Sequence, residues 1–351
     1  MLLYRDTIEL MKNTLRELLV PVLTSRPVSA IANRFLGRSV PIFSVHRLEQ
    51  EVNITTGITP KHLRNCLNYL RSEGFQLVSL EDLIQALLNH ATLPDKAVVF
   101  TMDDGYIEQA DITASIFIEF DCPLTFFVIT DMIDQVMWPW DAQVSWIINN
   151  TAETSLSIEL PDELIHLDIS DNDSMNTARQ KIRDIFKELD AETLSAMIGR
   201  LAQAAGIAVP SIAPPPYQAL NWQTARSLEQ KGIRFAPHSR THRILSKLSG
   251  ESAREEITGS WQTLQRELSN PLKVFCYPTG RLFDYGPREI SYLHEAGFLG
   301  ATSSLPGVVD LLNDDAEQQV YCLPRISLPN SMAYFIQCCS WIEHANRNRS
   351  L

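Results

Sequence analysis

The chain has 351 residues, of which 45% are hydrophobic and 21% charged, and this composition excludes fibrous and intrinsically disordered proteins. The formal net charge of −12 argues against a nucleic-acid-binding surface, because phosphate recognition needs clustered Lys and Arg. The length suits one large α/β barrel or two ordinary domains.

The six cysteines form neither a CxxC pair nor a disulfide-scaffold pattern, which favours a reducing compartment. Acidic residues interrupt the apolar ones near the N-terminus, so we expect no signal peptide. No segment reaches the roughly 20 apolar residues that a membrane-spanning helix requires. We therefore expect a cytoplasmic protein.

Residues 1–38 are predicted to form an N-terminal amphipathic helical segment. Apolar positions recur near helical spacing over residues 7–35, with Lys12, Arg16 and Glu17 between them. Such a segment either packs on its own domain or lies on an anionic membrane surface. The second interpretation would make the protein peripheral at the inner face of the membrane.

Residues 39–137 and 216–330 alternate strand-like and helix-like segments. In the first part, residues 41–45, 75–80 and 124–130 read as strands, and residues 60–74 as a helix that Gly74 ends. The apolar run 97–102 is typical of a strand buried on both faces. In the second part, the strands 234–238 and 273–278 flank a helix at 252–269. This alternation predicts βα units, and therefore a parallel sheet or a barrel.

Residues 138–215 break this alternation. An acidic polar patch precedes the helix-like residues 178–206, and a proline run follows at 213–217. We interpret this stretch as a mainly helical insertion between the two parts of the barrel. Residues 331–351 are predicted to form a C-terminal helix.

Asp103 and Asp104 stand where the apolar run 97–102 ends. The carboxyl ends of parallel strands form the active-site face of α/β architectures. One carboxylate could bind a metal ion while its neighbour acts on water. The alternative is a turn, because Asp and the following Gly105 both favour turns.

His238 and His242 directly follow another predicted strand. Two histidines with three residues between them can reach one cation if the chain turns there. Nitrogen and oxygen ligands around zinc with one open position are the general pattern of hydrolytic sites. Histidine pairs at this spacing also occur as surface or helix-capping residues.

The third motif lies where the predicted strand 273–278 ends in a proline- and glycine-containing loop. It comprises Tyr277, Pro278, Thr279 and Gly280. Such a loop can direct a backbone N–H toward an oxyanion, as acyl-transfer chemistry requires. Taken alone, the motif indicates only the end of a strand.

The order and context of the three motifs resemble the NodB-like polysaccharide deacetylases, also called carbohydrate esterase family four. That family's motifs T-F-D-D-G, H-[ST]-x-x-H and R-x-P-Y-G correspond here to residues 101–105, 238–242 and 277–280. The resemblance implies a distorted (β/α) barrel of the NodB-homology type. It also implies a hydrolase that removes N-acetyl groups from a polysaccharide, for example in exopolysaccharide biosynthesis, or from a lipid-linked amino sugar.

The resemblance further implies roles for individual residues. Asp104, His238 and His242 would bind a divalent cation, for which zinc is the first choice and cobalt, nickel or manganese are alternatives. Asp103 would be the general base toward a metal-bound water. The backbone N–H of Thr279 would stabilise the oxyanion, within the substrate loop formed by Tyr277, Pro278, Thr279 and Gly280.

The sequence departs from the family pattern at the residues that support the base. Cys276 stands where an arginine is common, Thr279 where a tyrosine is usual, and Met102 replaces a phenylalanine. Arg325 is the candidate replacement for the missing arginine, with a surface ion pair as its alternative role.

The family's late L-x-x-H motif, which holds the acid histidine, has no clear counterpart. His46 is the candidate acid, because relatives with this N-terminal layout resemble a permuted barrel with a Tyr-His pair on the first strand, here Val45-His46. His294 is expected to face outward from a helix. Two other functions stay open: an inactive carbohydrate-binding module, and a small-amide C–N hydrolase of the same superfamily.

Overall fold

A parallel sheet forms the centre of the protein. The computed structural model describes residues 15–25, 27–28, 39–48, 58–89, 91–160, 163–311 and 315–347. The main sheet has the strand order β12-β2-β4-β5-β8, with β3 paired to β4, and all its pairs are parallel. These strands are β2 (Ile42–Val45), β3 (Gln76–Leu77), β4 (Ala97–Met102), β5 (Leu124–Val128), β8 (Arg234–Pro237) and β12 (Ile326–Ser327). The predicted α/β fold with a parallel sheet is confirmed.

Further strands extend the sheet toward a curved arrangement. A parallel pair joins β9 (Val274–Cys276) to β10 (Gly300–Thr302), and a short antiparallel pair joins β1 (Ser39–Val40) to β11 (Val309–Asp310). Leu272 N donates to Phe235 O across the gap between β8 and β9. Thr302 of β10 forms a parallel bridge with Leu323, just before β12. This succession is compatible with the predicted distorted barrel.

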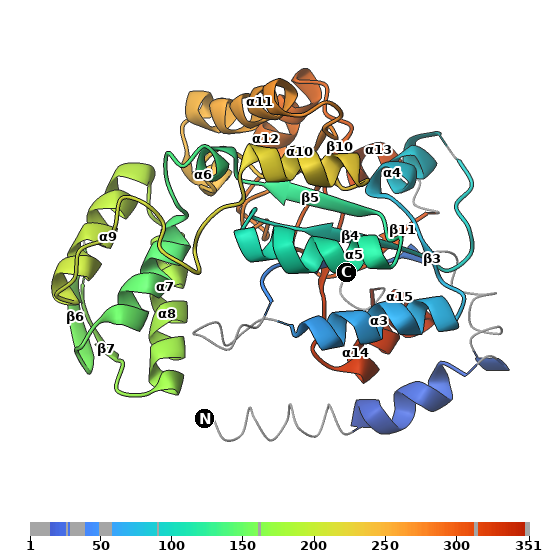
Figure 1. Cartoon of the computed structure of the whole chain (residues 1–351), viewed down its shortest axis with the longest axis horizontal. Helices are drawn as coiled ribbons and strands as arrows, with labels where there is room; N and C mark the ends of the chain where they lie inside the picture. The colour runs from blue at the N-terminus through green and yellow to red at the C-terminus, as the bar shows by residue number, and fades with distance from the viewer. Residues whose placement is uncertain are drawn as a thin grey trace.

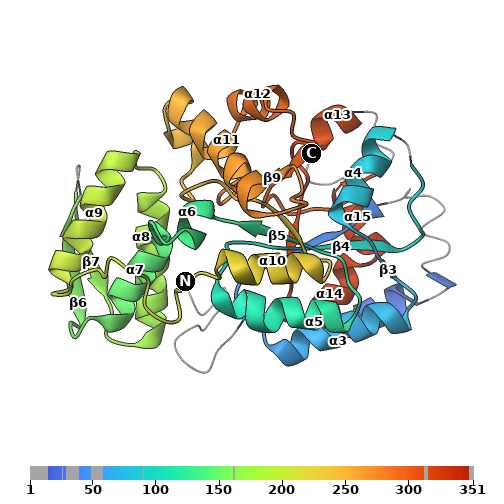
Figure 2. The same cartoon turned by 45° about the horizontal axis from the view of Figure 1, so that its top comes forward.

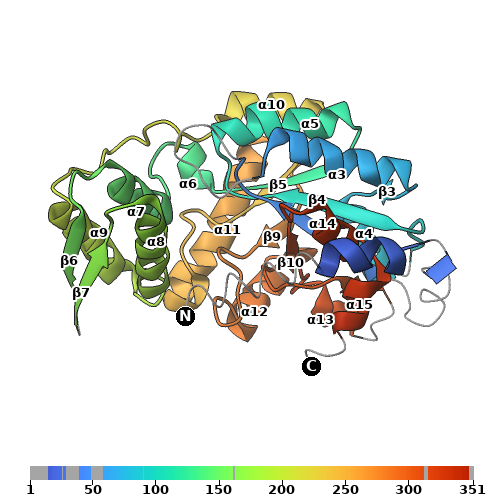
Figure 3. The ribbon, with the colours of Figure 1, turned by 90° about the horizontal axis from the view of Figure 1, so that it is seen from below.

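Helices cover both faces of the sheet, and β4 is therefore buried on both. Its residues Val98 and Phe100 belong to one apolar cluster, and Val99 to another, as the alternation of side chains along a strand requires. The first face carries α3 (Pro60–Ser72), α5 (Ala114–Glu119) and α10 (Trp222–Gln230), which lie side by side (Figure 3). The second face packs against α4 (Leu80–Asn89), α11 (Gly250–Glu267) and α12 (Pro287–Glu295).

The helices and strands between Trp140 and Ala204 form a compact unit beside the sheet (Figures 1 and 2). It contains α7 (Trp140–Asn150), α8 (Asn172–Phe186), α9 (Ala191–Ala204) and an antiparallel hairpin of β6 (Ser155–Glu159) and β7 (Leu164–Asp168). The sequence analysis expected helices here and did not identify the hairpin. Each hairpin strand alternates buried and exposed residues, and the buried ones join a cluster with α7, α8 and α9. This cluster gives the unit an apolar core of its own.

The two ends of the described chain lie together. Residues 15–23 are helical, and Trp341 Nε1 donates to Leu23 O at 3.0 Å. This helix exposes Leu15, Leu18, Leu19 and Val22; most of the predicted segment 1–38 lies outside the described residues. In place of one C-terminal helix there are two, α14 (Met332–Cys338) and α15 (Trp341–Arg347), because the chain turns at Ser340, whose hydroxyl accepts from Ile342 N.

The remaining short elements are η1 (Gln109–Thr113), α6 (Thr130–Ile133), η2 (Leu245–Lys247) and α13 (Ala316–Gln319). Within the described ranges, no helix combines the length and apolar character needed to cross a bilayer. All six cysteines are free thiols. This agrees with the absence of a disulfide pattern in the sequence, while the cellular compartment stays a prediction.

Candidate active site

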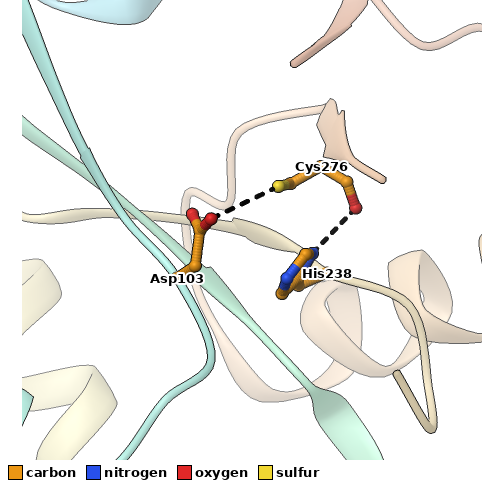
Figure 4. Close-up of side chains that lie close together, drawn as sticks. All are labelled: Asp103, His238 and Cys276. Atoms are coloured by element: carbon orange, nitrogen blue, oxygen red, sulfur yellow. Dashed lines mark hydrogen bonds between the residues drawn. The ribbon is translucent and has the colours of Figure 1, made fainter. Parts of the chain in front are cut away.

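The three sequence motifs meet at the carboxyl ends of neighbouring strands. Asp103 and Asp104 follow β4, His238 follows β8, and Cys276 is the last residue of β9. In a parallel sheet, these strand ends lie on one edge. Figure 4 shows Asp103, His238 and Cys276 pointing toward one another. The tertiary structure thus brings together segments that are more than a hundred positions apart in the chain.

Each motif includes a non-glycine residue in the left-handed backbone region. The φ angles are 90° for Asp104, 63° for Ser239, 60° for His242 and 55° for Thr279. Such conformations cost energy and persist only where surrounding contacts impose them, as they do at many active sites. Because each of the three motifs contains such a residue, we infer that surrounding contacts hold this region in a defined conformation.

The side chain of Gln109 stabilises the turn after β4. The sequence analysis gave this residue no role. Its Oε1 accepts from Gly105 N at 3.0 Å and from Tyr106 N at 2.8 Å. Its Nε2 donates to Asp103 O at 2.7 Å and to His46 O at 2.5 Å. The fully buried side chain therefore ties the Asp-Asp turn to the end of β2. A glutamine within a helix-like segment carries no sequence signal for such a role.

Arg325 holds Asp103 in a buried, bidentate ion pair. The Nη1–Oδ1 and Nη2–Oδ2 distances are both 2.7 Å. The guanidinium also donates to Thr101 Oγ1 at 3.1 Å and to Ser303 O at 2.9 Å, so its donors are well satisfied despite burial. The alternative role of Arg325 as a surface residue is wrong, because its side chain is only 1% exposed.

Cys276 lies beside this ion pair. Its Sγ is 3.8 Å from Asp103 Oδ2 and 3.2 Å from Arg325 Nη2 (Figure 4 shows the first contact). The guanidinium of Arg325 thus reaches Asp103 next to the position where the family pattern has its arginine. The small thiol leaves room for a guanidinium that comes from the segment just before β12.

The charge state of Asp103 follows from two opposing effects. Burial alone would raise the pKa of Asp103, but the positive charges of Arg325 and His46, together with the hydrogen bonds from Arg325, outweigh it. The pKa of Asp103 is therefore held well below its usual range, and the carboxylate is ionised at neutral pH. His46 Nε2 lies 3.5 Å from Asp103 Oδ2, and its side chain is 47% exposed. The imidazole therefore stands between the carboxylate and solvent.

Asp104, His238 and His242 form a group with the donor set of a divalent cation site. Asp104 Oδ1 lies 3.8 Å from His238 Nε2 and 3.9 Å from His242 Nε2. Metal–ligand bonds of about 2.0–2.2 Å can span such separations, and one carboxylate with two imidazoles suits zinc and similar ions. These residues therefore fit a divalent cation.

A second group, Asp103 with His238 and Cys276, also brings ligand atoms close together. It fits a cation less well, because Arg325 already engages both oxygens of Asp103. The Asp104 group is free of such an ion pair to Lys or Arg among the described residues. We therefore assign the candidate metal centre to Asp104, His238 and His242.

His238 is already oriented as a ligand would need to be. Its Nδ1 lies 2.8 Å from Cys276 O (Figure 4), so Nδ1 carries a proton and Nε2 is the nitrogen that faces Asp104. Burial would lower the pKa of His238, but Cys276 and the two carboxylates outweigh burial and raise this pKa to about 10. Burial, followed by the charge of His238, lowers the pKa of His242. Without a cation, His238 therefore carries the positive charge beside the carboxylates, and a bound cation would take the place of the proton on its Nε2.

The loop of Tyr277, Pro278, Thr279 and Gly280 presents backbone rather than side chains. Tyr277 is buried, donates its hydroxyl to Tyr321 O at 3.1 Å and stacks on Tyr285. A Cβ at Gly280 would meet Ser304 N at 2.9 Å, so only glycine fits there. In the described part of the chain, the backbone N–H of Thr279 donates to no acceptor. It is the group in this loop that is free to bind an oxyanion.

His294 lies on α12 and is exposed, as expected, with its ring 4.0 Å from the ring of Tyr321. It takes no part in the site.

Residues 158–299 match the family model described as polysaccharide deacetylase. The match covers His238, His242 and the loop at 277–280 and begins after Asp103 and Asp104. No curated protein sequence matches the chain.

Solved structures share the fold at low sequence identity. The deacetylase PplD of Streptococcus pyogenes in complex with acetate is 17% identical, with a TM-score of 0.55 over 84% of this chain and 95% of that one. A de-N-acetylase from Aggregatibacter actinomycetemcomitans is 15% identical, with a TM-score of 0.51 over 84% and 97%. IcaB from Ammonifex degensii is 14% identical, with a TM-score of 0.52 over 88% and 98%.

Proposed function

We propose that this chain removes N-acetyl groups from a glycan. The match of residues 158–299 to the polysaccharide deacetylase model supports this activity, which would make the chain a hydrolase of non-peptide carbon–nitrogen bonds. The substrate would be an N-acetylated polysaccharide or a lipid-linked amino sugar, and the products acetate and a free amine. The observation that supports this function most directly is the ionised, buried Asp103 beside the Asp104, His238 and His242 group.

The cation in this proposal is zinc, chosen on ligand type, with cobalt, nickel or manganese as alternatives. When bound, such an ion supplies a Lewis acid for the amide carbonyl and lowers the pKa of a water molecule that it binds. Asp104, His238 and His242 would hold it.

The other residues of the site act on protons and on developing charge. Asp103 accepts a proton as water attacks the acetamide carbon, because it is ionised and adjacent to the metal ligands. Arg325 keeps the Asp103 carboxylate oriented through the bidentate pair. The backbone N–H of Thr279 donates to the oxyanion. His46 delivers a proton to the nitrogen of the departing amine, since it is the imidazole that lies next to Asp103 and reaches solvent.

Metal analysis combined with acetate release tests the function. We expect the purified protein to bind about one divalent ion per chain, as a single three-residue site implies. We also expect it to release acetate from an N-acetylglucosamine oligomer and to leave an equal amount of free amine. A metal-loaded protein that releases acetate from no acetylated glycan or sugar-lipid would contradict the proposal and favour the inactive binding module. Turnover of small amides alone would favour the small-amide hydrolase.

Replacement of His46 by Gln tests its role as the acid. We expect kcat on an N-acetylated sugar to fall by about 100-fold, within the range for general acid catalysis. A 4-nitrophenyl acetate substrate needs no protonated leaving group, so its hydrolysis should change much less. The control is His62→Gln, because His62 contacts Pro329 O away from the site. Equal losses on both substrates would exclude His46 as the acid.

A further inference from the structure

The insertion reaches the candidate metal centre at Asp141, the second residue of α7. The ring of His242 lies between two carboxylates: Nε2 is 3.9 Å from Asp104 Oδ1, and Nδ1 is 4.0 Å from Asp141 Oδ1. One of these carboxylates belongs to the barrel strand β4, and the other to the insertion. The sequence analysis gave Asp141 no role.

His242 and Asp141 face each other with two buried polar atoms that lack a hydrogen bond. Among the described residues, both His242 Nδ1 and Asp141 Oδ1 lack any hydrogen bond, although a third of the Asp141 side chain is exposed. A buried polar atom without a hydrogen bond costs about 1–3 kcal/mol. A movement of roughly 1 Å would bring these atoms to hydrogen-bond distance. The pairing would satisfy both atoms at once.

The comparison with His238 shows what is missing at His242. The Nδ1 of His238 already contacts a carbonyl oxygen from the barrel, Cys276 O, at 2.8 Å. Metal-binding histidines almost always donate their second ring N–H to a carboxylate, a carbonyl or water, and this partner fixes the tautomer and the ring orientation. Asp141 is the carboxylate that faces the second ring nitrogen of His242.

The packing of the insertion fixes the position of Asp141. The neighbouring Trp140 is buried and lines one small cavity together with Arg243 and Ile244, which follow His242 in the chain. Lys247 Nζ also forms an ion pair with Glu188 Oε2 at 2.7 Å. The shared cavity and the ion pair place the insertion next to the segment that carries the second motif. The start of α7 therefore lies beside His242.

We propose that Asp141 is a positioning residue for the metal centre: it accepts the Nδ1–H of His242 and so directs the Nε2 lone pair toward the cation. This inference rests on the proposed metal site. It gives the insertion a function, because an element outside the barrel orients one ligand of the cation. An acidic residue in the first turn of a helix also interacts favourably with the helix dipole, so the test needs a control for that effect.

The experiment measures the Zn²⁺ dissociation constant of the full chain by competition with a chromophoric chelator. Asp141→Ala removes the acceptor, and we expect affinity to fall by about 10- to 100-fold, as for other partners of metal-binding histidines. Asp141→Asn keeps one acceptor oxygen without the charge, so its affinity should lie between wild type and Ala. The matched control is Asp173→Ala: Asp173 is also the second residue of its helix, α8, and its loss should leave affinity unchanged.

Asp104→Ala separates failure of this inference from failure of the proposed function. If Asp104→Ala loses Zn²⁺ while Asp141→Ala and Asp141→Asn bind like wild type, the metal site stands and Asp141 is not its positioning residue. If Asp104→Ala also binds like wild type, the proposed site itself is wrong. A loss in Asp173→Ala as large as in Asp141→Ala would assign the effect to the helix dipole and overturn the inference. If Asp141→Ala does not fold, Asp141→Asn decides, because it preserves side-chain size.

Discussion

Replacement of Asp103 by Asn is expected to lower kcat on an N-acetylated glycan by about 10²–10⁴-fold, the range for loss of a general base. The amide has nearly the same size as the carboxylate but does not accept a proton at neutral pH. Since Asp103 is not among the proposed ligands, metal content should stay at the wild-type level. Acetate-release kinetics and metal analysis on the same protein measure both quantities.

The loss of the ion pair with Arg325 complicates this variant, because Asn leaves the buried guanidinium without its counter-charge. Asp131→Asn is a suitable control: Asp131 also binds one arginine through both oxygens, Arg240 at 3.2 Å. Its kcat should change much less than that of Asp103→Asn. Unchanged activity in Asp103→Asn would exclude Asp103 as the base. Loss of the metal would instead indicate the alternative group of Asp103, His238 and Cys276.

Replacement of Arg325 by Met is expected to lower the free energy of unfolding by about 3–5 kcal/mol, the cost of removing one partner of a buried ion pair. Asp103 would stay buried without its counter-charge, and the donors to Thr101 and Ser303 would also be lost. Urea denaturation followed by circular dichroism measures this free energy. Acetate release should also fall, because Asp103 loses its orientation.

The matched control is Arg64→Met, which breaks the pair with Glu119 at the surface. Both partners are substantially exposed, at 42% and 52%, and such pairs contribute about 0–1 kcal/mol. The double variant Arg325→Met with Asp103→Asn should be more stable than the sum of the single effects predicts, since the two residues share one interaction. An Arg325→Met protein as stable as Arg64→Met would show that the pair is not needed for the fold.

The positions of the aspartate and histidine motifs at strand ends could be predicted because each depends on a short stretch of sequence. A continuous apolar run ends at Met102, and two carboxylates follow at once. In parallel-sheet proteins, strand ends gather on one edge, so the position of Asp103 and Asp104 follows from the chain itself. The same argument applies to His238 after β8. The alternation of strands and helices likewise predicts the sheet and the helices that cover it.

Hairpin β6–β7 could not be predicted from such local patterns. Its strands are only five residues long, and three residues of each face solvent. Asp168, at the exposed end of β7, begins the acidic polar patch that the sequence analysis placed in a mainly helical insertion. The strand character of the hairpin depends on packing of its other face against α7, α8 and α9, because β propensity is strongly context-dependent.

The sequence alone therefore determined most strands and helices of residues 39–137 and 216–330, the aspartate pair and the histidine pair, since each depends on residues within a few positions of one another. Only the tertiary structure decided their partners. Arg325, a candidate that the family resemblance left beside a surface alternative, binds Asp103 across 222 positions. Gln109 joins two strand ends, and Asp141 faces His242 from the insertion. Contacts between residues so far apart depend on how the elements pack, and no local spacing or periodicity in one chain encodes them.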